Sequence, residues 1–134
     1  AEKLGVSDYV SITGFVNRKQ VLNLLPQFDV FAFPSYSEGM PNAVLEAMGC
    51  GLPIVMTDCE GHKELISDNG FVVPLNGPIT EDILQSLLKL IKDPALCIKM
   101  GQRSREIATQ TFTWKNTAAQ YLGLLKTMEI KEVE

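Results

Sequence analysis

Two short apolar runs joined by a helix-length segment constrain the fold of this chain most strongly. They are DVFAFP at residues 29–34 and LPIVMT at residues 52–57. Runs that are apolar almost throughout are typical of strands covered on both faces, as in a parallel sheet. Pro41 suits the first turn of a helix at about residues 41–50, and Gly51 suits the position just past its end. Because parallel strands need such a crossover, we expect a strand–helix–strand unit here.

The alternation of strands and helices continues on both sides of this unit. Further strands are expected at residues 9–15 and 71–75, and Pro74 places the second of these at a sheet edge. Helices are expected at residues 18–28, 61–67, 81–92, 94–110 and 114–128, with Thr80, Asp93 and Thr113 as N-caps. The pattern predicts an α/β fold with a doubly wound, Rossmann-like parallel sheet and helices on both faces. Its four expected strands are fewer than the six of a complete domain of this kind.

Composition narrows the classes of function. The 134 residues suffice for one domain, and a net charge of −4 without a basic block argues against binding to nucleic acid. A lone His62 and three widely spaced cysteines make no plausible metal set. No other cofactor is expected. We expect free thiols in the cytoplasm, because the sequence shows no signal peptide and no apolar run long enough to span a membrane.

The first residues, AEKLG, look like the last turn of a helix that ends at a capping Gly5. The sequence also begins without methionine. We therefore expect the chain to be part of a longer protein.

The loop at residues 35–40 follows one buried strand and opens the central helix, which is where ligands bind in open parallel sheets. A helix N-terminus carries unpaired N–H groups and a partial positive charge. Gly39 lets the backbone approach a ligand, and the small Ala43 keeps the first helical turn accessible. An anion such as a diphosphate is the natural ligand for this loop.

Glu38 and Glu46 lie on either side of this expected phosphate site, one in the loop and one in the helix. Asn42, Glu46 and Gly49 are spaced i, i+4, i+7, so Glu46 shares a helix face with a residue that has no side chain. Carboxylates accept paired hydrogen bonds from the vicinal hydroxyls of a polyol. The alternative is that both glutamates are solvated surface residues, since their spacing alone is common.

The segment SEGMPNAVLEAMGCGLPIV resembles the Glu-x7-Glu signature of retaining glycosyltransferases of family 4. The likeness extends to YVSITGFVNRKQVLNLLPQFDVFAFPS before it and to GHKELISDNGFVVPLN and TFTW after it. It covers nearly the whole chain and implies a truncated, donor-binding C-terminal half of the two-domain GT-B fold. It also implies transfer of a sugar from a nucleoside diphosphate sugar, with retention of anomeric configuration and without a bound metal.

The resemblance assigns roles to single residues. Glu38 would be the catalytic residue and would contact hydroxyls of the donor sugar, while Glu46 would hold the ribose. The implied donor-binding set is Glu38, Gly39, Met40, Pro41, Asn42, Ala43, Val44 and Glu46, with backbone N–H groups of residues 40–44 on the diphosphate. Phe15, Val16 and Arg18 would line the base pocket. Met40 stands where the family often has an aromatic residue, which leaves the sugar contact there open.

The implied partners are the nucleotide-sugar donor, a saccharide or lipid-linked saccharide acceptor, and an N-terminal domain of the same protein. That acceptor domain and the first β/α units, whose basic pair neutralises the departing diphosphate, have no counterpart in residues 1–134. We therefore expect no transferase activity from these residues alone. Membrane association of the whole protein, at the inner face, stays open. So do two alternative functions, a GT-B-like nucleotide-sugar epimerase and a non-catalytic α/β interaction domain.

Other conspicuous residues receive structural roles. His62 is expected to be structural, and Gly61 to leave room beside the diphosphate. Cys50 and Cys59 are expected to pack as small apolar residues. Trp114, together with Phe112, is expected to plug the core rather than to form a sugar platform. The run QRSRE at residues 102–106 is expected to be a solvated helix face.

Overall fold

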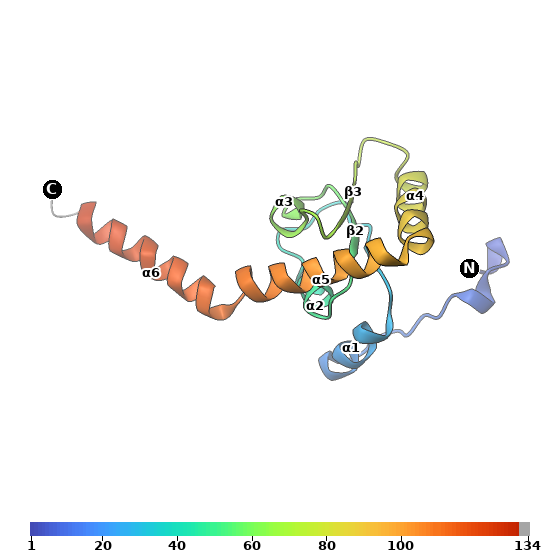
Figure 1. The fold of residues 1–134 in the computed structure, drawn as a ribbon, viewed down its shortest axis with the longest axis horizontal. Helices are drawn as coiled ribbons and strands as arrows, with labels where there is room; N and C mark the ends of the chain where they lie inside the picture. The colour runs from blue at the N-terminus through green and yellow to red at the C-terminus, as the bar shows by residue number, and fades with distance from the viewer. Residues whose placement is uncertain (132–134) are drawn as a thin grey trace.

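The expected strand–helix–strand unit forms and lies at the centre of the molecule. In the computed structural model, which describes residues 1–131, β1 (Phe31–Phe33), β2 (Ile54–Thr57) and β3 (Gly70–Val73) make one parallel sheet in the order β1-β2-β3 (Figure 1). Ile54 lies opposite Phe31 on one side and Gly70 on the other. All four residues of β2 are buried, because a strand flanks each edge and helices cover both faces.

Six α-helices accompany the strands in residues 1–131. They are α1 (Arg18–Leu24), α2 (Asn42–Gly49), α3 (His62–Leu65), α4 (Ile79–Lys92), α5 (Pro94–Thr111) and α6 (Trp114–Lys131). Short 3-10 turns occur at Glu2–Leu4, Ser7–Tyr9 and Leu25–Gln27. The predicted fold class, a parallel α/β sheet with helices on both faces, is confirmed.

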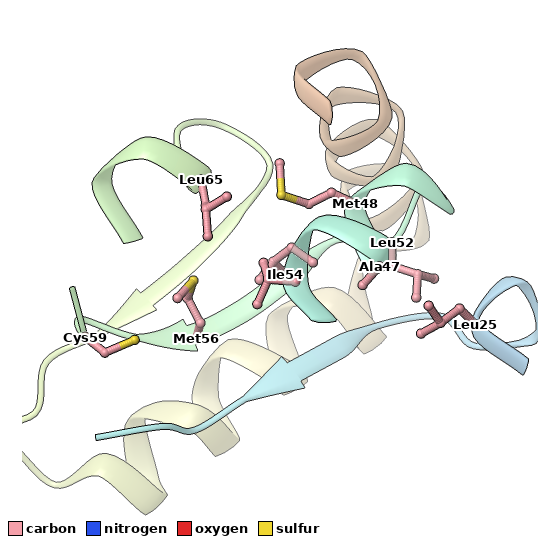
Figure 2. Packing of buried hydrophobic residues seen from close by; sticks show 9 residues of the cluster. Leu25, Ala47, Met48, Leu52, Ile54, Met56, Cys59 and Leu65 are labelled. Carbon is pink, nitrogen blue, oxygen red and sulfur yellow. The ribbon is translucent and has the colours of Figure 1, made fainter. Parts of the chain in front are cut away.

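The larger core lies between α2 and the sheet (Figure 2). Met48 from α2, Leu65 from α3 and Ile54 from β2 are fully buried there. Ile107 of α5 and Phe112, the residue that follows α5, close this layer. Burial of such side chains is the main favourable contribution to folding, about 1.5–3 kcal/mol for each large one.

A smaller core fills the opposite face of the sheet. Val55 of β2 and Val73 of β3 pack there against Leu90 of α4. Successive side chains of β2 point to opposite faces of the sheet: Ile54 and Met56 face α2, and Val55 faces α4. Both faces of this strand are therefore covered by apolar layers.

A contact between two glycines fixes α5 against α2. A β-carbon on Gly101 of α5 would lie 2.2 Å from the carbonyl oxygen of Gly51, two residues past the end of α2. Gly51 itself has a φ of 82°, in the left-handed region that favours glycine. Its predicted position just past the helix is therefore confirmed.

The strand predicted at residues 9–15 is wrong. Residues Ser7–Tyr9 form a 3-10 turn, and the apolar side chains of Val10, Ile12 and Phe15 are exposed. A strand needs a hydrogen-bonded neighbour, and none of the described residues pairs with this segment. The sheet in residues 1–131 therefore has three strands instead of the four expected.

β1 also differs from its prediction. It is an edge strand with Ala32 exposed, and it is therefore not covered on both faces. β3 occupies the other edge, as Pro74 at its end indicated.

Several helix boundaries differ from their predictions for reasons visible in the sequence. α1 ends at Leu24 and gives way to a 3-10 turn that contains Pro26, so the helix predicted to residue 28 is shorter. α4 begins at Ile79, one residue before the predicted cap Thr80, which therefore caps nothing. The predicted caps of α5 and α6 are confirmed: Asp93 accepts from the N–H of Leu96 at 3.0 Å, and Thr113 accepts from the N–H of Asn116 at 3.1 Å.

The two ends of the described chain extend away from the sheet (Figure 1). Residues 1–15 are all exposed, and α6 continues outward beyond α5. α6 presents exposed Trp114, Tyr121 and Leu125 at helical spacing. Within residues 1–131 no helix is both long and apolar enough to cross a membrane.

Candidate functional site

Two hydroxyl groups, those of Ser35 and Thr57, make hydrogen bonds that hold the loop between β1 and α2. Ser35 donates from Oγ to Oε1 of Glu38 at 3.2 Å, which fixes one carboxylate oxygen of the half-buried glutamate. Thr57, at the end of β2, donates from Oγ1 to the carbonyl oxygen of Ser35. The loop is thereby tied to the carboxyl ends of two neighbouring strands, where ligands of open α/β sheets bind.

Gly39 and Gly61 bring two loops together at this edge. A β-carbon on Gly61 would lie 2.1 Å from the carbonyl oxygen of Gly39, and the φ of Gly61 is 84°. Gly39 itself has open space where a side chain would be. The loop that carries Glu38 is therefore backed by the β2–α3 connection, while its outer side stays accessible.

The N-terminus of α2 is uncapped. Pro41 occupies the N-cap position instead of the predicted first helical position, so α2 begins one residue later than predicted. No side chain at the N-cap accepts a hydrogen bond from the N–H groups of the first turn. Val44 donates its N–H to the carbonyl oxygen of Pro41 at 3.0 Å, whereas the N–H groups of Asn42 and Ala43 take no acceptor among the described residues. Both of these residues are exposed. Among residues 41–44 the accessible donors for an anion are thus Asn42 and Ala43, because the Val44 N–H is already bonded and Pro41, within the predicted donor range, has no N–H to donate.

Glu46 lies on the face of α2 that turns toward α1. Its Oε1 lies 3.9 Å from Nε of Arg18, and its side chain is 32% exposed. The Arg18 side chain is 83% exposed, so this ion pair contributes little to stability. The contact nevertheless shows that the start of α1 lies beside α2.

Of the three predicted base-pocket residues, only Arg18 makes an ion pair with another predicted site residue within residues 1–131. Arg18 reaches Glu46, Val16 is half-buried, and Phe15 is 96% exposed. Asn17 and Gln20 form a capping box that sets the start of α1, with Asn17 Oδ1 accepting from the Gln20 N–H at 3.0 Å. The sequence signal for this box, Asn followed three residues later by Gln, was missed.

A hollow of about 620 Å³ opens beside the start of α2. Its walls come from Met40, Asn42 and Leu45, from Glu64 of α3, and from the junction of α5 and α6, which contributes Thr111, Phe112, Thr113, Trp114, Thr117 and Gln120. Trp114 is 89% exposed, so the prediction that it plugs the core is wrong, whereas Phe112 does pack against the core. The exposed aromatic ring thus belongs to Trp114, the first residue of α6, while Phe112 between the two helices is turned to the core.

The remaining candidates have structural roles. Nδ1 of His62 lies 2.7 Å from the carbonyl oxygen of Cys59 and holds the first turn of α3. Cys59 is buried and Cys50 half-buried, as expected for packing residues, and both are free thiols. Burial, with the nearby Glu46 carboxylate, raises the pKa of the Cys50 thiol. A protonated thiol is a poor nucleophile, which argues against a reactive cysteine at this site.

A buried polar pair ties the turn before β3 to α5, and no local pattern in the sequence points to it. Asn69 and Ser104 are fully buried, and Nδ2 of Asn69 donates to Oγ of Ser104 at 3.2 Å. The same amide donates to the carbonyl oxygen of Leu65 and accepts from the N–H of Ser67. Residues 102–106 are therefore not simply a solvated face.

The sequence pattern that defines group 1 glycosyl transferases matches residues 1–93. This match covers more than half of the chain and includes both glutamates and the uncapped start of α2. The chain belongs to the group 1 glycosyltransferases. The two carboxylates thus flank a helix N-terminus in a member of a family of sugar-transferring proteins.

Relatives and solved structures agree with this family. The chain is 34% identical over 107 residues to the N,N'-diacetylbacillosaminyl-diphospho-undecaprenol alpha-1,3-N-acetylgalactosaminyltransferase of Campylobacter jejuni, covering 80% of this chain and 28% of that protein. It is 35% identical over 83 residues to the UDP-Gal:alpha-D-GlcNAc-diphosphoundecaprenol alpha-1,3-galactosyltransferase of Escherichia coli, covering 60% of this chain and 21% of that protein. The sucrose-phosphate synthase of Thermosynechococcus elongatus superposes with a TM-score of 0.83 and 23% identity, over 97% of this chain and 33% of the other.

These matches support the predicted fold and the transferase class. The sucrose-phosphate synthase superposition places the chain in the GT-B architecture. The chain spans less than a third of the length of the relatives named above. Because the family match is to transferases, it disfavours the epimerase alternative.

Proposed function

We propose that this chain forms the donor-binding surface of a retaining glycosyltransferase. The whole protein would transfer a sugar from a nucleoside diphosphate sugar to a saccharide or lipid-linked saccharide. The observation that carries this proposal is the uncapped N-terminus of α2 between Glu38 and Glu46. Family membership supports the same conclusion independently of that geometry.

The diphosphate of the donor is assigned to the start of α2. The accessible N–H groups of Asn42 and Ala43 point their positive ends at an anion, and the helix dipole adds a partial positive charge. Gly39 offers open space for the close approach that a phosphate needs. No basic side chain is required for this contact, which suits an acidic chain.

The two glutamates are assigned to the two polyols of the donor. Glu46, one turn into α2, would accept hydrogen bonds from the ribose hydroxyls, and its contact with Arg18 would open as the ribose enters. Glu38 would accept from hydroxyls of the transferred sugar and act as the catalytic residue. Because Ser35 already holds one Glu38 oxygen, the carboxylate is oriented before the sugar arrives.

The names of the two relatives suggest the chemistry of both substrates. One relative is named for UDP-Gal as donor, and both are named for saccharides on a diphosphate-linked undecaprenol. We take a uridine diphosphate sugar and a lipid-diphosphate-linked saccharide as the first substrates to try. Such an acceptor would bring the whole protein to the inner face of the cytoplasmic membrane.

We expect this chain to bind the sugar donor but not to catalyse transfer of the sugar. Departure of a nucleoside diphosphate builds negative charge, and electrostatic stabilisation of developing charge usually contributes more to catalysis than any other effect. Arg18 pairs with Glu46, at the proposed ribose end of the site, and not with the start of α2 where the phosphates are assigned. We therefore expect residues 1–134 to bind the donor without transferring its sugar, and the rest of the protein to supply the missing cations.

A calorimetric titration tests this proposal. UDP should bind the chain with a millimolar or lower Kd, and Glu46→Ala should weaken binding by roughly tenfold or more, as loss of charge-assisted hydrogen bonds implies. Glu81→Ala is the matched control, because Glu81 is an exposed helical glutamate whose carboxylate accepts from Gln85 of its own helix. Equal weakening by both substitutions, or no UDP binding, would contradict the assignment of Glu46.

A further inference from the structure

We propose that Thr57 and Ser35 position the Glu38 carboxylate for the transferred sugar and thereby set how strongly the chain holds the sugar part of its donor. Neither hydroxyl touches the donor in this proposal. Each acts through Glu38, so both are positioning residues. The inference rests on the proposed function, because that function assigns Glu38 to the sugar.

Thr57 is the fixed end of this arrangement. It is the last residue of β2, is only 1% exposed, and lies opposite Val73 of β3. A hydroxyl at such a buried position is costly unless it has a hydrogen-bond partner. Its partner is the carbonyl oxygen of Ser35, 22 positions earlier in the sequence. A β-branched side chain has few χ1 rotamers, so the position of this donor is set by the strand that carries it.

Ser35 connects this fixed point to Glu38. Its N–H donates to the carbonyl oxygen of Phe33 at 3.1 Å, and its own carbonyl oxygen accepts from Thr57. With the backbone held on both sides, Oγ of Ser35 donates to Oε1 of Glu38 at 3.2 Å. The other acceptor within reach, the carbonyl oxygen of Ser37, is farther away at 3.4 Å and carries no charge. A charged acceptor makes the stronger hydrogen bond, so the single hydroxyl proton of Ser35 favours Glu38.

Glu38 keeps one carboxylate oxygen for a ligand. Within residues 1–131, Ser35 bonds Oε1, and no hydrogen bond or ion pair involves Oε2. The half-buried carboxylate therefore has one oxygen held and one oxygen available to accept from a sugar hydroxyl. A side chain that is already oriented loses less conformational freedom when its ligand binds. The two hydroxyls should therefore strengthen the contact with the sugar and with no other part of the donor.

The phosphate site at the start of α2 does not depend on these hydroxyls. Three buried residues anchor that helix in the core, namely Val44, Ala47 and Met48. Gly61 supports the loop at Gly39, next to the start of α2. Ser35 and Thr57 hold only the end of the loop that leaves β1. Loss of either hydroxyl should therefore affect the sugar and spare the phosphates.

Comparing a UDP-sugar with UDP isolates this effect. Calorimetry gives the Kd of UDP, UDP-galactose and UDP-N-acetylgalactosamine, which carry the sugars in the names of the two relatives above. Thr57→Val keeps the shape of the side chain and removes its hydroxyl, and Ser35→Ala removes the second hydroxyl. Each should weaken binding of at least one UDP-sugar by roughly threefold to tenfold, the loss typical of one hydrogen bond. UDP should bind both variants as tightly as it binds the wild type.

Matched variants separate positioning from a purely structural role. Thr57→Ser keeps the hydroxyl and should return the UDP-sugar affinity close to the wild-type value. Ser37→Ala, at an exposed serine of the same loop, should change neither affinity. The double variant of Thr57→Val and Ser35→Ala should bind the UDP-sugar no more weakly than Ser35→Ala alone, because both changes act through one hydrogen bond to Glu38.

The outcomes distinguish this inference from the proposed function. Equal weakening of UDP and the UDP-sugars in the variants would mean that the hydroxyls merely hold the loop, and would overturn the inference. The inference also fails if UDP binds but neither UDP-sugar does, or if the UDP-sugar affinity is the same in every variant, and in these cases the phosphate site stands. Failure of the wild type to bind UDP would contradict the proposed function and this inference with it.

Discussion

A β-carbon placed on Gly61 would lie 2.1 Å from the carbonyl oxygen of Gly39. Real β-carbon contacts do not come so close, so a glycine is required where the β2–α3 connection meets the loop that carries Glu38. The positive φ of Gly61, 84°, adds a second reason for glycine at this position. The conformation of the Glu38 loop therefore depends on a residue more than twenty positions later in the sequence.

Gly61→Ala should displace the Glu38 loop and weaken nucleotide binding. The new methyl group must push against backbone, which cannot rotate away as a side chain would. Titration of UDP should show a clear loss of affinity, with far-UV circular dichroism unchanged. Gly123→Ala is the control, because a β-carbon there meets open space within a helix and should leave binding intact or add slightly to stability.

Asn69→Ala should destabilise the chain through lost hydrogen bonds between the α3–β3 turn and α5. The Asn69 amide bonds Ser104, Leu65 and Ser67, and its removal takes one hydrogen bond from each, of which the bonds to Leu65 and Ser104 are buried. The free energy of unfolding should fall by about 1–3 kcal/mol for each group left unsatisfied. Urea denaturation measures this change, and Asn76→Ala, at an exposed asparagine, is the comparison. Equal midpoints for the two variants would contradict a structural role for the pair.

Met48→Ala should be strongly destabilising because the side chain is fully buried between α2 and the sheet (Figure 2). Large-to-small changes at such positions lower the free energy of unfolding by about 2–5 kcal/mol. Met128→Ala removes the same side chain from α6, where it is 66% exposed, and should cost little. A similar loss for both methionines, measured by chemical denaturation, would show that this layer is not the core of the domain.

The pair of Asp68 and Arg103 should give a small pH-dependent contribution to stability. Arg103 Nε donates to Oδ1 of Asp68 at 2.7 Å, and this hydrogen bond lowers the pKa of Asp68 below its usual value. Because the folded-state pKa is below that of the unfolded chain, about 3.9, the contribution is present at neutral pH and is lost as the pH falls through the folded value. Both groups are at the surface, so the effect is modest.

Unfolding of the wild-type chain and of Asp68→Asn, measured across this acid range, tests that linkage. The wild type should be the more stable protein at neutral pH, and the difference should shrink as the pH falls below about 3.9. A difference that grows on acidification would have the wrong sign for a lowered pKa.

The sequence was most informative where local chemistry decides the structure. The apolar run at residues 52–57 predicted the buried strand β2, and Asp93 and Thr113 predicted the starts of α5 and α6. Gly51 marked the end of α2 because only a glycine adopts its left-handed φ without strain. Each of these signals acts within a few residues, so a single sequence carries it.

Features that depend on distant neighbours could not be predicted in the same way. The alternation at residues 9–15 favours a strand, yet no described strand lies beside it to complete a ladder. The bond between Asn69 and Ser104 joins positions 35 residues apart, and the exposure of Trp114 depends on Phe112 taking the core position. The Glu38 loop was placed correctly at the carboxyl end of β1, but its supports, Thr57 and Gly61, follow from tertiary contacts alone.

The central claim is that the start of α2, between Glu38 and Glu46, holds a nucleoside diphosphate. Its most direct test is to titrate UDP, GDP and ADP into isotopically labelled protein and to map the backbone amide shifts. We predict that at least one nucleotide shifts the amides of residues 14–18 and 35–46, led by Asn42 and Ala43, and that Glu46→Ala suppresses these shifts. Shifts confined to other residues, or none at millimolar nucleotide, would contradict the claim.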